Sequence, residues 1–82
     1  MQLAGELLSD WNVRLHSGHT VQVWADGYTE EADSFVFSAL VDATETEQAN
    51  LDITARTPSN PERVIIVIAR FPTDSVDSIL SA

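Results

Sequence analysis

Apolar residues occur at every second position through much of this sequence, and this alternation restricts the fold more than any other feature. It is clearest where Trp11, Val13 and Leu15 alternate with Asn12 and Arg14. Successive side chains of a β-strand point to opposite faces, so the alternation is typical of a strand with one buried face. The sequence therefore predicts a chain built mainly of β-strands.

Five segments have this strand character. They are residues 11–16, 20–25, 34–41, 51–56 and 63–71. The Ser17-Gly18 pair between the first two segments suits a tight hairpin, because glycine readily adopts positive φ. Residues 64–69 are continuously apolar and mostly β-branched, which predicts a central strand buried on both faces. The acidic stretch 26–33 is expected to be a polar loop.

Three segments have helical features. Residues 2–9 place three leucines on one face and predict a short N-terminal helix. Thr44 and Glu47 have the spacing of a capping box, which predicts a single helical turn. Residues 73–82 fit a short C-terminal helix by apolar spacing, but their Ser, Thr, Asp and Val content disfavours a helix interior. A tight turn followed by a closing strand is the alternative there.

These elements define the fold class and the domain organisation. With 82 residues, the chain has room for one domain, residues 1–82. We expect a β-rich α+β fold, either a five-stranded antiparallel meander or a small closed barrel. A short helix followed by five bent strands resembles Sm-like and SH3-like small barrels in element order, a resemblance that implies fold and not function.

The charge of the chain restricts its partners. Thirteen acidic residues stand against four basic residues, all arginine, and the net charge is −9. Such a surface repels phosphates and anionic lipids, so we expect no direct binding to nucleic acid or membrane. A signal peptide begins with basic side chains, and the first ten residues of this chain carry none. The expected location is therefore the cytoplasm.

No recognisable catalytic or ligand-binding motif is present. The sequence has no cysteine and three scattered glycines, which excludes thiolate chemistry and a glycine-rich phosphate loop. His16 and His19 flank a turn, but a metal would need further ligands there. We therefore expect no enzyme activity, no catalytic residue, no metal and no cofactor.

Aromatic and arginine side chains provide the candidate interaction residues. If Val21 and Val23 face the core, Trp24 and Tyr28 fall on the opposite face, and we expect Arg14 and Arg56 on that side too. Trp, Tyr and Arg are enriched in interface hot spots. The leading hypothesis is a non-catalytic protein-interaction module that binds a protein partner or forms a homodimer. The simplest alternative is that Trp24 packs under a terminal helix or inside a closed barrel.

The acidic charge supports a second functional hypothesis. An acidic inhibitor that mimics nucleic acid could occupy a basic protein cleft, provided that its carboxylates lie along one face. High charge can also serve solubility alone.

Overall fold

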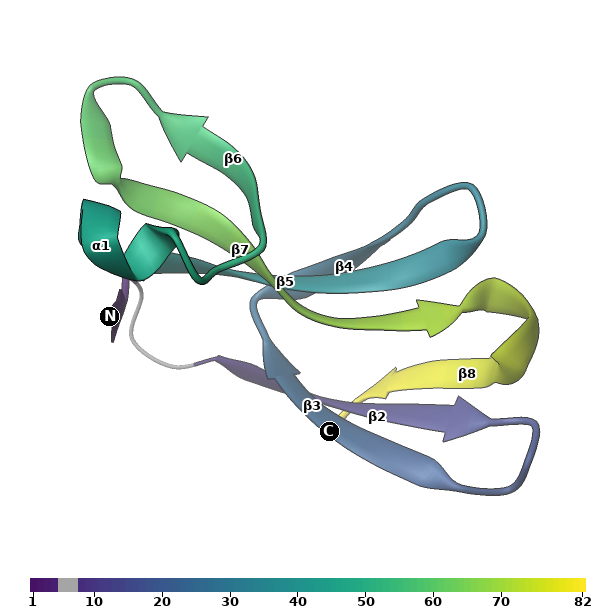
Figure 1. Cartoon of the computed structure of the whole chain (residues 1–82). Coiled ribbons are helices and arrows are strands. Elements are labelled where there is room, and N and C mark those ends of the chain that lie inside the picture. Colours follow the sequence, from purple (N-terminus) through teal and green to yellow (C-terminus); the bar gives the residue numbers. More distant parts are fainter. Residues whose placement is uncertain (5–7) are drawn as a thin grey trace.

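The computed structural model describes residues 1–4 and 8–82. The elements are β1 (Gln2–Leu3), β2 (Ser9–Leu15), β3 (Thr20–Ala25), β4 (Gly27–Glu30), β5 (Ser34–Asp42), α1 (Glu45–Gln48), β6 (Ile53–Thr57), β7 (Asn60–Pro72), the 3₁₀ turn η1 (Thr73–Ser75) and β8 (Val76–Ser81). The strands form two antiparallel sheets. In Figure 1, β2, β3 and β8 lie below the halves of β5 and β7 that lead to β4 and η1. The prediction of a mainly β, antiparallel fold is confirmed.

The predicted single meander and closed barrel are wrong. The large sheet has the order β1-β5-β7-β6, with β4 also pairing β5, and the small sheet has the order β3-β2-β8. Asp26 carries the chain from β3 in the small sheet to β4 in the large one, and η1 carries it back from β7 to β8. A closed barrel would need strands that pair from one sheet to the other where the chain changes sheet, at Asp26 and at η1. The described strands instead leave both sheets with free edges.

Each strand predicted from the alternation is present, but one strand lies where a loop is expected. β4 occupies Gly27–Glu30 and pairs with β5, with Tyr28 opposite Phe37. Its sequence combines a glycine, an acidic residue and acidic neighbours, so its composition resembles a polar loop. Its pairing with the long, apolar β5 determines its conformation, because strand propensity depends strongly on context.

The helix predictions have mixed outcomes. Thr44 caps α1: the Glu47 amide donates to Thr44 Oγ1, and the Thr44 amide donates to Glu47 Oε1 at 3.0 Å, as the capping box predicts. The predicted helix over residues 2–9 is wrong where the chain is described, because Gln2–Leu3 pairs with β5 and Ser9 begins β2. Its middle, residues 5–7, lies outside the described residues.

The C-terminal segment takes the strand alternative. The turn η1 precedes β8, whose backbone pairs with β2. A short C-terminal helix is therefore wrong. Serine, threonine and aspartate disfavour a helix interior, and the strand lets Val76 and Ile79 cover the core beside Leu15 and Val13.

The core has two parts, and β5 and β7 are long enough to contribute to both. Val13, Val23, Ala25, Phe37 and Val76 form the buried cluster between the two sheets. Ala39, Val41, Ala43, Val64 and Ile66 form a second cluster, against which Leu8, Leu51 and Ile53 pack. The small sheet therefore has one face on the first cluster, and its other face is the outer face described below.

The second face of the central strand β7 is not fully covered. Val64 and Ile66 are buried, but Ile65 and Val67 are half-buried and Ile68 is 42% exposed. The predicted burial of residues 64–69 on both faces is therefore wrong for the outer side. The pattern indicated a central strand correctly, since β7 lies between β5 and β6.

Candidate functional site

The outer face of the small sheet presents the candidate interaction residues. Val13 is fully buried, so its neighbours on β2 point away from the core. Strand register places a set of side chains with them: Asp10, Asn12 and Arg14 on β2, Thr20, Gln22 and Trp24 on β3, and Ser78 and Leu80 on β8. We call this set the outer face.

Two large apolar side chains stand on the outer face. Trp24 is 53% exposed and Leu80 is 48% exposed. They belong to strands on either side of β2, so they are separated by roughly 10 Å across the sheet at about 4.8 Å per strand. The described part of the chain leaves both of them substantially open to solvent.

The centre of the outer face is polar. Gln22 Nε2 donates to Asp10 Oδ2 at 2.6 Å, and Asp10 lies directly opposite Trp24. The second carboxylate oxygen, Oδ1, is buried and has no hydrogen-bond partner among the described residues. The outer face therefore combines apolar and polar side chains, and a mixed composition is typical of non-obligate protein interfaces taken as a whole.

Tyr28 does not share this face with Trp24, and the prediction that it does is wrong. Tyr28 lies in the large sheet, with its ring centroid 5.4 Å from that of Trp11 and 5.2 Å from that of Phe37. It covers the edge of the core between the sheets and keeps 39% of its surface exposed there. The turn at Asp26 explains the difference, because the strand alternation does not continue through it.

The two candidate arginines separate in the same way. Arg14 lies on the outer face, exposed, opposite Thr20 and Ser78. Arg56 lies on β6 of the large sheet, exposed and in register with Val64. The structure therefore brings Trp24 and Arg14 to one face and places Tyr28 and Arg56 elsewhere.

Sequence reasoning missed Leu80 and Gln22 as members of this face. The apolar spacing of residues 76–80 fits a helix, and simple strand alternation would place Val76 and Leu80 on the same face. In the structure Asp77 is the extra residue of a bulge in β8, so Val76 is buried while Leu80 points outward. Gln22 follows from the alternation of β3, since it lies between the inward Val21 and Val23.

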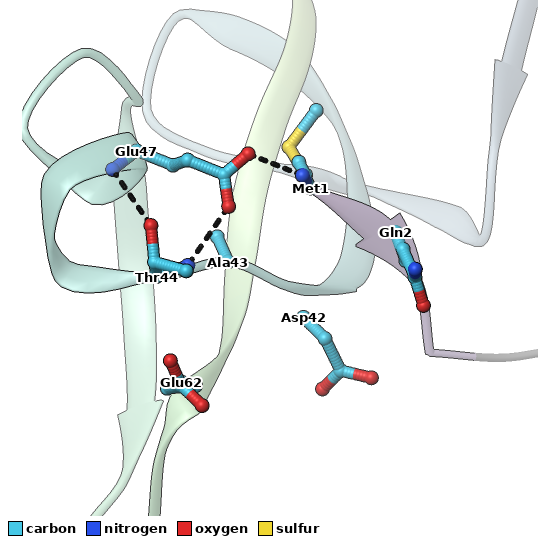
Figure 2. A pocket seen from close by; sticks show the side chains of 7 residues that line it. All are labelled: Met1, Gln2, Asp42, Ala43, Thr44, Glu47 and Glu62. Carbon is cyan, nitrogen blue, oxygen red and sulfur yellow. Dashed lines mark hydrogen bonds and ion pairs between the residues drawn. The ribbon is translucent and has the colours of Figure 1, made fainter.

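A small pocket lies at the other end of the molecule, beside the start of α1 (Figure 2). Its volume is about 180 Å³. It is lined by Met1, Gln2, Asp42, Ala43, Thr44, Glu47 and Glu62. A typical small-molecule site is larger, at about 300–1,000 Å³.

Two of the three carboxylates in this pocket already have partners. Hydrogen bonds from Arg63, with Nε 3.0 Å from Asp42 Oδ1, lower the pKa of Asp42 below its ordinary value. The pKa of Glu47 is lowered first by its hydrogen bond from the Met1 amine and then by the Thr44 amide. Asp42 therefore serves in a structural ion pair, and Glu47 serves in an ion pair and as part of the helix cap.

The described histidines and acidic residues do not form a cation site. Within residues 1–4 and 8–82, no group of three or more His, Asp and Glu side chains could hold a metal ion. His16 Nδ1 lies 3.8 Å from Asp77 Oδ1, an exposed pair. No helix in the described part of the chain has the length and apolar character needed to cross a membrane.

The acidic side chains that the structure describes are not gathered on one face. They occur on α1, in the loop between β4 and β5, on η1, and on β2, at positions such as Glu45, Glu31, Asp74 and Asp10. Mimicry of a nucleic acid needs carboxylates in a phosphate-like row, and this distribution does not favour it. Mimicry of a nucleic acid therefore stays a prediction from the charge alone.

Comparisons with known proteins add no family. No family model matches the chain, and searches of curated proteins and of solved structures give no significant match.

Proposed function

We propose that this protein is a non-catalytic protein-interaction module whose binding surface is the outer face of the small sheet. The main support for this proposal is the pair Trp24 and Leu80, two large apolar side chains that are about half exposed on one face. Tryptophan is the residue type most enriched in interface hot spots, and a partner that covers its indole gains apolar burial. Arg14 adds a cation on the same face.

The exposed Ile68 on the large sheet is less suitable as an anchor. Its apolar neighbours on that outer side, Ile65 and Val67, are half-buried, so Ile68 is the single exposed large apolar side chain of β7. Ion pairs between Asp42 and Arg63 and between Asp52 and Arg70 border that region. Exposed ion pairs contribute little to binding. Ile68 therefore serves as a matched control for Trp24.

We expect Trp24→Ala to weaken partner binding by roughly tenfold or more, the size of a moderate hot spot, and Ile68→Ala to leave binding unchanged. The measurement is affinity capture with the wild-type protein, followed by titration of the captured protein, once purified, with both variants. Melting curves control for folding, since an exposed side chain should contribute less than about 1 kcal/mol to stability.

Two results would contradict the proposal. One is equal binding by wild type and Trp24→Ala. The other is a chain that captures no protein and stays monomeric at all concentrations, which would leave the outer face without any occupant.

A further inference from the structure

Among residues 1–4 and 8–82, no strand pairs with the free side of β3, so its backbone groups there are unpaired in a defined pattern. The Leu15 amide donates to the His19 carbonyl at 2.9 Å, and the Ala82 amide donates to the Asp10 carbonyl at 2.9 Å. Asp10 therefore directs its backbone toward β8, and its opposite residue Trp24 directs its own backbone outward. By the alternation of antiparallel ladders, Thr20, Gln22 and Trp24 all point their amides and carbonyls away from β2.

This edge lacks the features that usually block strand pairing. β3 has the sequence Thr-Val-Gln-Val-Trp-Ala, with no charge, proline or glycine. The other longer edge strands carry such features: Glu30 on β4, Arg56 and two register irregularities on β6, and Asp77 on β8. An uncharged, regular, β-prone edge is a ready template for another strand.

We propose that β3 pairs antiparallel with β3 of a second copy of this chain, about a twofold axis at Gln22. This joins two three-stranded small sheets into one continuous sheet. The inference rests on the proposed function, because it names the occupant of the region around Trp24. It adds a distinct mechanism, in which backbone pairing at the edge supplies the contact.

The symmetry of the edge favours a second copy as the occupant. Antiparallel pairing about Gln22 sets Gln22 against Gln22 of the second copy and Thr20 against its Trp24. Every outward amide and carbonyl of those three residues then has a partner. Each Trp24 indole lies over Thr20 of the other copy, so the pairing also buries exposed apolar surface. Such an interface is isologous and closes at two copies.

The charge of the chain supports the same choice of surface. Two copies with a net charge of −9 each repel one another, so they can approach most closely where charges are absent. β3 is the longest uncharged edge strand in the described part of the chain. Salt screens the repulsion, so association through β3 is expected to strengthen with added salt, opposite to an interface held by ion pairs.

The test compares Gln22→Pro with Gln22→Val by sedimentation velocity. Both variants lose the side-chain hydrogen bond to Asp10, but proline alone removes the outward amide and places its ring at the free edge. The β2–β3 ladder is spared, because that amide does not point to β2. Runs from about 10 μM to about 1 mM, in low salt and in about 0.5 M NaCl, cover weak association.

We expect wild type and Gln22→Val to dimerise with similar affinity, more tightly in high salt, and Gln22→Pro to be at least roughly tenfold weaker. Far-UV circular dichroism and melting confirm that the variants fold. A wild-type chain that stays monomeric at every concentration and salt would overturn the edge pairing. The proposed function would still be judged separately, by the capture experiment with Trp24→Ala.

Three further outcomes would also overturn the inference. A dimer that survives Gln22→Pro but is lost in Trp24→Ala would mean contact between outer faces, which supports the proposed function without the edge pairing. A dimer weakened equally by Gln22→Pro and Gln22→Val would depend on the Gln22 side chain. Wild-type association that weakens with salt would indicate ion pairs instead.

Discussion

Replacing Phe37 by alanine is expected to cost about 3–5 kcal/mol of unfolding free energy, the largest effect of any single truncation proposed for this chain. Phe37 is fully buried between the two sheets. Its ring centroid lies 5.2 Å from that of Tyr28, 5.8 Å from that of Phe71 and 6.3 Å from that of Trp11. Alanine would leave a cavity at the point where these rings meet.

The effect is large relative to the stability of a small domain, which is about 5–15 kcal/mol. A loss of this size lowers the melting temperature by roughly 15 °C or more in a chain of this length. Thermal and urea unfolding measure it, with Ile68→Ala as the control because that side chain is exposed on the same sheet. Equal losses in the two variants would contradict the assignment of Phe37 to the core between the sheets.

Replacing Gln48 by glutamate is expected to cost about 3–5 kcal/mol at neutral pH, although the side chains have the same shape. Gln48 is 8% exposed, and its Nε2 donates to the Ala43 carbonyl at 2.9 Å and to the Pro61 carbonyl at 2.8 Å. The amide thus connects α1 to the end of β5 and the start of β7. A carboxylate would instead place a buried charge against two carbonyl oxygens.

The loss in Gln48→Glu should depend on pH. Burial against carbonyls raises the pKa of a carboxyl in the folded state, so the folded chain holds its proton more tightly than the unfolded chain. The variant is then least destabilised below about pH 4, near the unfolded carboxyl pKa, and its stability relative to wild type falls as the pH rises above that value.

Gln48→Met is the matched control for this prediction. It keeps the length of the side chain, loses both hydrogen bonds, and should cost about 1–3 kcal/mol with no pH dependence relative to wild type. If Gln48→Glu is as stable as wild type at neutral pH, the side chain is not held against the Ala43 and Pro61 carbonyls.

The local patterns of the sequence predict much of this fold because they depend on near neighbours. Alternation along β2 and β3 identifies both strands and their inward faces, since strand side chains alternate whatever the strand pairs with. The capping box at Thr44 and Glu47 predicts α1, because its hydrogen bonds lie within one turn. Trp24 is predicted on the outward face for the same local reason.

The parts that were not predicted depend on contacts between distant segments. Tyr28 follows Trp24 by four residues, but the turn at Asp26 moves it into the other sheet, where its ring packs on Trp11. The Asp26 carboxylate accepts the Leu40 amide at 2.6 Å, and the Asp26 amide donates to the Ser38 carbonyl, contacts that no local pattern encodes. Leu80 joins the outer face because β8 pairs with β2, near the opposite end of the sequence.

Hydrogen exchange of the two indole N–H groups, followed by NMR, tests most directly whether the outer face is open for binding. Trp11 Nε1 donates to the Ala25 carbonyl at 3.1 Å, so its proton should exchange slowly at every concentration. Trp24 has no such bond among the described residues, and its proton should exchange rapidly in dilute solution. On concentration, the Trp24 resonance should shift as copies pair, while that of Trp11 stays in place. Slow exchange of both protons in dilute solution would contradict the account, because the chain itself would then cover the proposed binding face.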